Sequence, residues 1–151
     1  VHGRTREEFY SGVADWNIVK EIKKALYIPV IGNGDIKDQE TFEERVKLSS
    51  VDAVMIGRGA QGNPFLFNSL ARNGPKKENV PFQEIYDIVK EHYELEAEYK
   101  GIDKAVREMR KHIGWYIKGL PMVAKVRNEI NQTTDIQTAQ ELLTEYFEHL
   151  T

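Results

Sequence analysis

The sequence predicts an α/β segment followed by an all-α segment, in which a small parallel sheet with crossover helices precedes a small helical bundle. Three observations support this. Helical and short branched apolar patterns alternate over residues 1–72. Both apolar runs end in glycine-rich turns, and after residue 81 only helical periodicity remains. Alternation of strands and helices is typical of a parallel sheet with right-handed crossovers.

In the first segment the expected order is helix, strand, helix, strand, helix. Apolar residues in 16–26 recur at the spacing of one buried helix face. Residues 28–31 form a short apolar run, as a buried parallel strand does. Asp38 is expected to begin the second helix, and residues 51–56 form the second strand. Asn63 and Pro64 suit the start of a third helix, because proline is favoured at a first helical position.

The second segment is separated from the first by a linker and contains four predicted helices. Residues 73–81 are rich in glycine, proline and charged side chains, which is typical of a linker. Short turns between helices are typical of a small bundle, so residues 82–151 are expected to form one domain. The expected helices are 82–99, 103–119, 122–130 and a last one that begins with a capping box of Thr138 and Glu141.

Composition excludes several classes of protein. The 151 residues include no cysteine, which excludes disulfides and thiol chemistry carried by this chain. No run of about 18 apolar residues is present, so no transmembrane helix is expected. A cytoplasmic location is the default for such a chain.

Charge is distributed unevenly along the chain. The net charge of −3 by itself argues against a nucleic-acid partner. Residues 100–127, however, carry eight basic and two acidic side chains, whereas residues 78–99 have a net charge of −6 and residues 128–151 of −5. A cationic segment between two anionic ones can bind a polyanion although the total charge is negative.

Both predicted strands end in glycine turns. Gly32-Asn33-Gly34-Asp35 and Gly57-Arg58-Gly59 fall at the carboxyl ends of their strands, where parallel sheets bind ligands. Free backbone N–H groups in such turns bind anions, and Arg58 adds a positive charge. The pair of turns matches the phosphate site that (βα)8 barrels build from their last two loops. The alternative is that the glycines only permit tight turns.

A helical wheel of residues 103–120 separates an apolar face from a cationic one. Trp115 falls beside the cations, so an indole ring and positive charges would face outward together. Cations neutralise phosphates and an aromatic ring can stack on an unpaired base, which predicts RNA binding. The alternative is a solvated charged face. The candidate RNA-binding residues of this segment are Lys104, Arg107, Arg110, Lys111, Trp115, Lys118, Lys125 and Arg127, of which Arg110 lies at the border of the two faces.

Several blocks of residues carry a resemblance to a known family. Val1-His2-Gly3-Arg4-Thr5-Arg6, residues 28–36 and residues 54–64 resemble the tRNA-dihydrouridine synthases, most closely their bacterial B-type branch. Residues 109–112 and 115–119 are similar to the C-terminal domain of that family, so the resemblance covers essentially the whole chain. Residues 28–36 alone would be shared with other flavin barrels.

The resemblance implies an enzyme that reduces uridine to dihydrouridine in tRNA, with FMN bound in a (βα)8 TIM barrel and reduced by NADPH. It implies that Asn33, Gly34 and Asp35 lie on FMN and that Gly57 and Arg58 hold its phosphate. His2 would lie by the isoalloxazine ring, although an ordinary strand-end histidine is the alternative. Arg4 would face the substrate or the tRNA phosphates.

The chain departs from the family pattern in one respect. The family's proton donor is a cysteine in the first half of the barrel, and this sequence has none. We therefore expect a C-terminal fragment that is inactive by itself. The expected fragment would self-associate through Val30, Ile31, Val54 and Met55. The other readings are another FMN barrel acting on a small molecule and a stand-alone RNA-binding helical module.

Overall fold

The computed structural model describes residues 1–9, 11–72 and 74–150, and shows a mostly helical chain with a small parallel sheet. The chain divides into two compact units. Unit 1 comprises residues 1–60 and 64–76, and unit 2 comprises residues 61–63 and 77–151. Asn73, in the predicted linker, and Thr151, the last residue of the predicted helical domain, lie outside the described residues.

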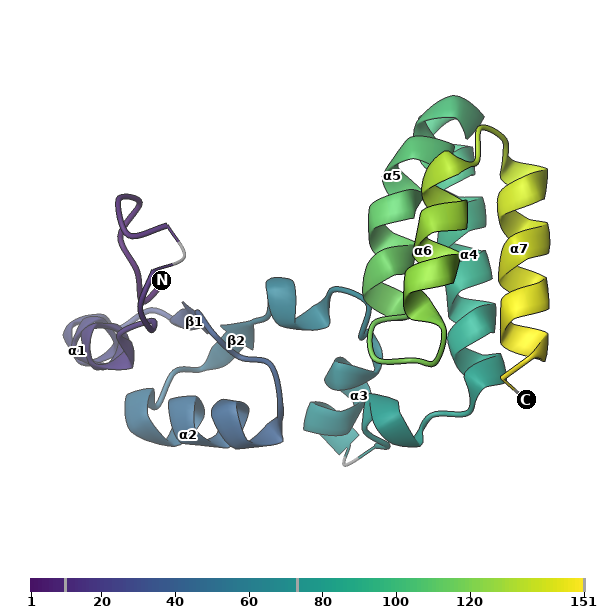
Figure 1. The fold of residues 1–151 in the computed structure, drawn as a ribbon. Helices are drawn as coiled ribbons and strands as arrows, with labels where there is room; N and C mark the ends of the chain where they lie inside the picture. The colour runs from purple at the N-terminus through teal and green to yellow at the C-terminus, as the bar shows by residue number, and fades with distance from the viewer. Residues whose placement is uncertain (10, 73, 151) are drawn as a thin grey trace. The chain divides into compact units, whose positions relative to one another are not determined.

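The sheet of unit 1 consists of β1 (Ile31–Asn33) and β2 (Ala53–Met55), which are parallel (Figure 1). The first residues of the chain run beside β1: His2 forms a parallel bridge with Asn33, whose N–H donates to the carbonyl of Val1 over 2.8 Å. The bridged N-terminal residues and the ends of β1 and β2 thus lie side by side and run in the same direction.

Both strands are shorter than predicted. The expected strand 28–31 contains only one residue of β1, because Pro29 has no N–H and the N–H of Val30 donates to the Asp52 carboxylate over 2.6 Å. The second strand begins at Ala53 rather than at residue 51. Regular pairing therefore starts only after this side-chain contact.

Three helices complete unit 1: α1 (Trp16–Ala25), α2 (Gln39–Ser49) and α3 (Phe65–Arg72). The predicted start at Asp38 is confirmed, because its carboxylate accepts the N–H of Thr41 and forms a capping box with that residue. A 3-10 turn, η1 (Arg58–Ala60), follows β2.

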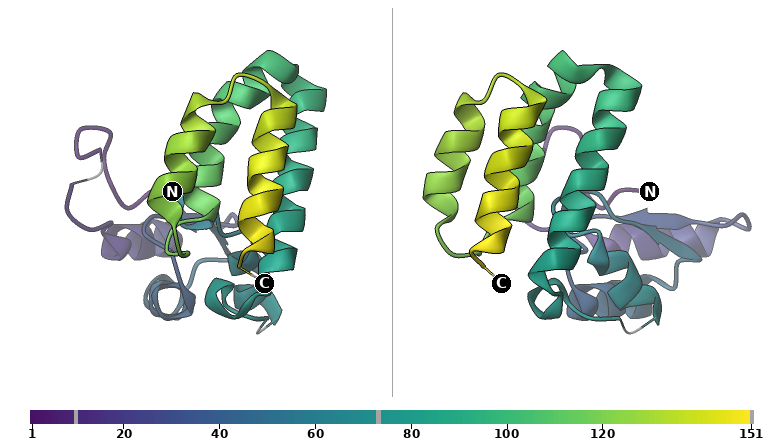
Figure 2. Two further views of the ribbon diagram at one scale, coloured as in Figure 1. Left: turned by 45° about the vertical axis from the view of Figure 1, so that its right-hand side comes forward. Right: turned by 90° about the vertical axis from the view of Figure 1, so that its right-hand side faces the viewer.

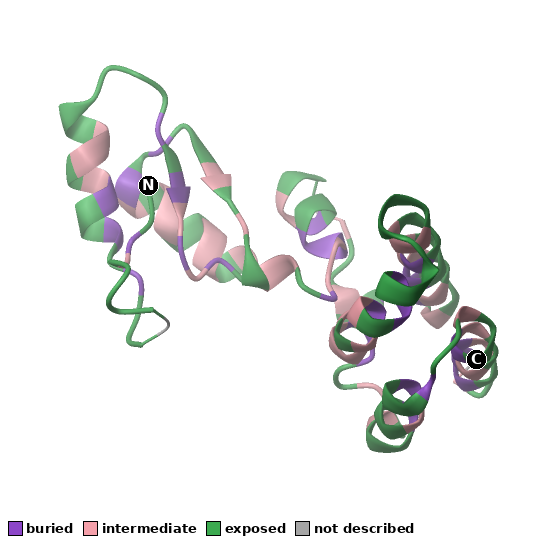
Figure 3. Ribbon diagram, turned by 90° about the horizontal axis from the view of Figure 1, so that it is seen from above, coloured by how far each residue is buried: buried purple, intermediate pink, exposed green. Residues whose placement is uncertain are grey.

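One apolar cluster of buried residues holds unit 1 together; Figure 3 colours all buried residues purple. Its members are Ala14, Trp16, Val19, Val30, Ile36 and Val51. Val30 is buried in this cluster, so its side chain is not part of the sheet face expected to self-associate. Successive side chains of an extended segment point to opposite faces, so Val30 turns to the helices and Ile31 turns away. Ile31 and Met55 are 53% and 60% exposed in this structure.

The described residues of unit 2 form four helices (Figure 2): α4 (Phe82–Lys100), α5 (Ile102–Tyr116), α6 (Val123–Gln132) and α7 (Ile136–Glu148). Buried apolar side chains from all four helices form a second core. The apolar face predicted for the cationic helix is inward, with Met109 and Ile117 fully buried. None of the helices in the described parts of the chain is long and apolar enough to cross a membrane.

Helix boundaries of unit 2 differ from prediction at several places; α6, for example, is Val123–Gln132 where 122–130 was predicted. The helix expected over 103–119 ends at Tyr116, and Ile117 takes the C-cap position. The last helix begins after Asp135, whose carboxylate accepts the N–H of Thr138, so the predicted capping box of Thr138 and Glu141 is wrong. Aspartate is as good an N-cap residue as threonine. Asp135 lies three residues before Thr138, so the helix begins earlier than predicted.

The C-terminal end of α5 is held by two segments of unit 2. A 3-10 turn, η2 (Lys77–Asn79), lies within the predicted linker, and Lys77 Nζ donates to the Tyr116 carbonyl over 2.7 Å. Gly62 lies against the same end, because a Cβ on it would be 2.3 Å from the carbonyl carbon of Trp115. These contacts fix the last turn of the helix.

We expect Gly62→Ala to loosen this end of α5. Both the positive φ of 67° and the contact with main-chain atoms oppose a side chain there, so the chain must shift. The matched control is Gly101→Ala, because Gly101 has a φ of 83° and open space around it. Hydrogen exchange of the α5 C-terminal amides should accelerate in Gly62→Ala alone. Equal exchange in the two variants would contradict the contact.

Candidate functional site

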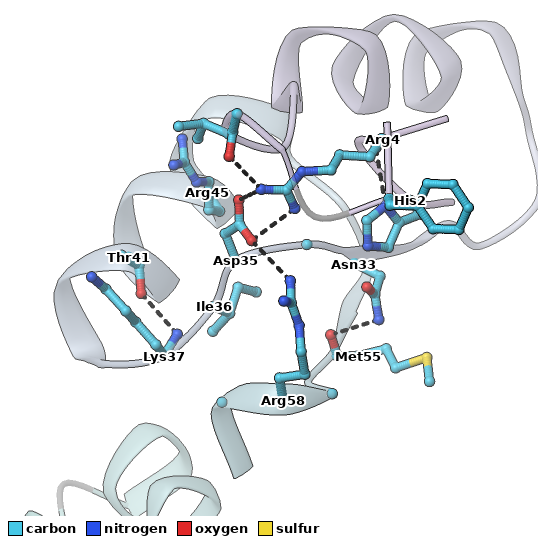
Figure 4. A pocket seen from close by; sticks show the side chains of 16 residues that line it. His2, Arg4, Asn33, Asp35, Ile36, Lys37, Thr41, Arg45, Met55 and Arg58 are labelled. Atoms are coloured by element: carbon cyan, nitrogen blue, oxygen red, sulfur yellow. Dashed lines mark hydrogen bonds and ion pairs between the residues drawn. The ribbon is translucent and has the colours of Figure 1, made fainter. Parts of the chain in front are cut away.

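The strand ends of unit 1 surround a pocket of about 740 Å³ (Figure 4). The parallel register aligns His2, Asn33 and Met55 in one row. Gly32 and Asn33, predicted as part of the first turn, are the last residues of β1, so the turn itself begins at Gly34, and Gly57 follows shortly after Met55. The pocket is lined by His2, Arg4, Phe9, Gly12, Val13, Asn33, Gly34, Asp35, Ile36, Lys37, Thr41, Arg45, Met55, Gly57, Arg58 and Gly59. All six candidate cofactor residues predicted from the sequence therefore lie in one pocket.

Arg4 and Asp35 form the centre of this pocket. The Arg4 guanidinium donates to both carboxylate oxygens of Asp35, over 2.8 and 2.7 Å, and also to the carbonyls of Ser11 and Gly12. Only 4% of the Arg4 side chain is exposed. Its donors are thus engaged within the protein, and this geometry lends no support to the tRNA-facing role predicted for Arg4.

The same contacts fix the charge of Asp35. The hydrogen bond from Arg4 holds the pKa of this carboxyl below its ordinary value, with further lowering from the Ala14 N–H and the charge of Arg58, while burial acts in the opposite direction. Asp35 is therefore a carboxylate at neutral pH. Its backbone has a φ of 52°, in the left-handed region, which turns the chain out of β1 toward α2.

Arg58 reaches toward this carboxylate from the second turn. Its Nη2 lies 3.8 Å from Asp35 Oδ1, and about half of its side chain (54%) is exposed. Among the lining residues in the described parts of the chain, the cations are Arg4, Lys37, Arg45 and Arg58, and Asp35 is the only acid. Since Arg4 is neutralised by Asp35, the pocket keeps an excess of positive charge, which favours an anionic ligand.

The glycine of the second turn leaves room for a ligand. A Cβ built on Gly57 would meet no atom within 4 Å. The turn that follows is the 3-10 turn η1. Open space beside the guanidinium of Arg58 suits a phosphate group, because arginine binds phosphate with planar donors.

The tautomer of His2 follows from one hydrogen bond. The backbone N–H of Arg4 donates to His2 Nδ1 over 2.9 Å, so this nitrogen acts as an acceptor. In the neutral imidazole the proton is then on Nε2, which is the donor left for a ligand. His2 is exposed at the rim of the pocket.

Trp16 supports the first turn, a role that the sequence did not reveal. Its indole Nε1–H donates to the carbonyl of Gly34 over 2.9 Å. Its ring lies directly beneath the strand end, because a Cβ on Gly32 would be 2.6 Å from it. The helical pattern placed Trp16 inward but could not show the contact with a turn 18 residues away. Asn33 likewise ties the two strands together, by donating to the Met55 carbonyl over 3.2 Å.

The second candidate site is a cationic groove of about 540 Å³ in unit 2. It is lined by Arg107, Arg110, Lys111, Gly114, Trp115, Lys118, Gly119, Val123, Arg127 and Asn131. Lys111 Nζ lies 5.1 Å from the centre of the Trp115 ring, a cation–π contact. Trp115 is only half-buried, so part of its indole remains open to the groove.

Most of the predicted RNA-binding residues meet in this groove, but three need separate mention. Lys104 and Lys125 lie outside its lining and face Glu108 and Glu129 one helical turn away, at 3.8 and 3.9 Å. Arg110 lines the groove but donates through Nη2 to the Thr133 carbonyl. The sequence missed Asn131 here, and Lys37, Thr41 and Arg45 in the first pocket. Asn131, Thr41 and Arg45 are helical residues that share no motif with the turns, and Lys37 lies in the loop just after Asp35.

Parallel strand ends with glycine turns and an excess of cations are the features of a candidate anion-binding site of the α/β class. Residues 1–151 match the family model described as "Dihydrouridine synthase (Dus)". The chain belongs to this family.

Individual relatives agree with the family match. A "Probable tRNA-dihydrouridine synthase" of Rickettsia conorii is 41% identical over 150 residues, which is 97% of this chain and 45% of that protein. A "tRNA-dihydrouridine synthase B" of Pseudomonas aeruginosa is 39% identical over 144 residues, 92% of this chain and 43% of that protein. Another of the same name, from Xanthomonas campestris, is 37% identical over 99% of this chain and 46% of its own length. The chain thus spans somewhat less than half the length of these relatives.

Proposed function

We propose that this chain is the C-terminal part of a cytoplasmic, flavin-dependent tRNA-dihydrouridine synthase, which reduces uridine in tRNA with NADPH through FMN. In this proposal unit 1 is the end of a (βα)8 barrel and unit 2 is a tRNA-binding domain. The chain by itself is inactive, since it has no cysteine to act as the family's proton donor. Family membership favours this proposal over a flavin barrel that acts on a small molecule.

The observation that carries the proposal is the register of the strand ends. Asn33 and Met55 are paired, so the turns that contain Asp35 and Arg58 project from the same edge of the sheet into one pocket. A phosphate group fits the cationic side of that pocket, where the open turn at Gly57 adjoins the guanidinium of Arg58. The donor set therefore suits the phosphate of FMN. When FMN is bound, its flavin ring supplies hydride-transfer chemistry.

In this proposal each residue of the site has a separate role. Gly57 and Arg58 hold the phosphate, and Asp35 keeps the guanidinium of Arg58 near the turn. Arg4 keeps Asp35 ionised and in place and thus acts as a positioning residue. His2 would be the residue that offers a hydrogen-bond donor, its Nε2–H, to a bound flavin, where a donor would stabilise negative charge.

The groove of unit 2 supplies the RNA contacts of the proposal. Arg107 and Lys111 on α5, Lys118 in the turn after it and Arg127 on α6 line the same hollow, and the half-open indole of Trp115 lies among them. Cations at several points of one hollow suit a phosphate backbone, and the indole suits an unpaired base. The alternative, a stand-alone RNA-binding helical module, uses the same groove but gives no role to the pocket of unit 1.

A tRNA-reduction assay tests the proposal. The full-length protein is incubated with NADPH and unmodified tRNA, and dihydrouridine is measured by mass spectrometry of the nucleosides. We expect dihydrouridine to form with the full-length protein and not with this chain alone. A full-length protein that holds flavin but leaves every uridine unreduced would contradict the proposal.

A further inference from the structure

Three side chains with metal-binding atoms meet where α4 packs on α5 within unit 2. They are His92 and Glu96 on α4 and His112 on α5, and each offers one ligand atom within 4.8 Å of the other two. We propose that they bind one divalent zinc-class cation, which links the two helices. The proposal concerns only unit 2 and stands independently of the flavin site.

The spacing of these atoms is close to that of a zinc site. His92 and Glu96 are one helical turn apart and share a face of α4, and His92 Nε2 lies 3.7 Å from Glu96 Oε1. That separation is too long for a hydrogen bond. Tetrahedral zinc with bonds of about 2.0–2.2 Å holds its ligands roughly 3.3–3.6 Å apart, so a small side-chain rotation completes the site.

Tyr116 orients the first of these ligands. The phenol oxygen of this buried residue lies 3.2 Å from His92 Nδ1. When Nδ1 carries the proton and donates to this oxygen, the Nε2 lone pair is directed to the side of Glu96. A hydrogen bond to the outer nitrogen of a ligating histidine is the usual support of such a ligand.

The ligand set selects the type of cation. Two imidazoles and one carboxylate suit zinc and its neighbours, whereas magnesium and calcium prefer oxygen ligands alone. The ring centroids of His92 and His112 lie 4.8 Å apart and edge-on. Three protein ligands leave a fourth position for water, because the cluster is only half-buried.

Lys100 competes with the proposed cation. Its Nζ donates to Glu96 Oε1 over 2.9 Å, lies 2.8 Å from Glu96 Oε2, and donates to Glu108 Oε2 over 2.8 Å, so it can remain paired with Glu108 when Glu96 turns to a metal. Lys111 is the other nearby cation, and it lies over the Trp115 ring. Removal of the Lys100 charge should therefore strengthen metal binding, a result that random binding to surface histidines would not give.

Zinc titration of the tag-free protein against a chromophoric chelator tests the site. We expect one Zn²⁺ to be bound by this site, with an affinity that falls at least tenfold in His112→Gln and also falls in Tyr116→Phe. Lys100→Met should bind Zn²⁺ more tightly than the parent protein. Zn²⁺ should also raise the midpoint of thermal unfolding of the parent protein but not of His112→Gln, because binding stabilises the folded state.

The matched control is His149→Gln, which removes an exposed histidine outside the cluster. It should leave the zinc affinity unchanged, and circular dichroism checks that each variant keeps its helices. Equal zinc affinity in His112→Gln and His149→Gln, or no binding by the parent protein, would overturn the proposal. Weaker binding in Lys100→Met would overturn it as well.

Discussion

Replacing Trp16 with alanine should lower the free energy of unfolding of unit 1 by about 3–5 kcal/mol. The side chain is 1% exposed and packs in the apolar cluster of the unit, so its loss leaves a cavity beneath Gly32. It also leaves the Gly34 carbonyl without the indole donor. Urea denaturation followed by circular dichroism measures the change in stability.

The control is the other tryptophan of the chain. Trp115 is only half-buried, so Trp115→Ala should cost less stability while it weakens RNA binding. A third variant, Trp16→Phe, keeps most of the apolar contact and removes the hydrogen bond to Gly34. An unfolding midpoint of Trp16→Ala equal to that of the parent protein would show that the ring does not support the sheet.

The double change Lys111→Glu with Lys118→Glu should weaken tRNA binding at least about tenfold and reduce the slope of log affinity against log salt by about 2. Both lysines are exposed and line the groove of unit 2. Each cation that neutralises a phosphate releases a counterion, so each loss lowers the salt dependence by about one unit. Filter binding of unmodified tRNA over a range of salt concentrations measures both quantities.

The matched control makes the same change in net charge at two lysines outside the groove. Lys47 and Lys90 are exposed lysines that line neither the pocket of unit 1 nor the groove. Their joint replacement by glutamate should leave the salt slope near its parent value. An equal loss of affinity in both double variants would mean that tRNA responds to net charge and that the groove is not the binding surface.

The sequence predicted the elements of this chain better than their ends. Periodicity placed the buried face of α5 correctly, because the apolar stripe of an amphipathic helix is the face that packs against the rest of the protein. Boundaries were set by single side chains instead. Asp52 delays the start of β1 by binding the Val30 N–H, and Asp135 begins α7 earlier than the expected threonine.

The candidate site was likewise predictable only in part. Glycine turns with Asp35 and Arg58 were visible as motifs, since they lie close together in the sequence. The ion pair of Arg4 with Asp35 was not, because it joins residues 31 positions apart and depends on how the first residues pair with β1. Trp16 fitted an ordinary apolar pattern, and only the fold showed that its indole holds Gly34.

Flavin retention by the full-length protein tests the central claim most directly. Arg58→Gln removes the cation beside the open turn at Gly57, and Arg72→Gln removes an exposed arginine of α3 outside the pocket. We expect Arg58→Gln to lose most of its bound FMN, measured by absorbance after gel filtration, and Arg72→Gln to keep the parent amount. The same FMN content in both variants would contradict a phosphate site at the paired glycine turns.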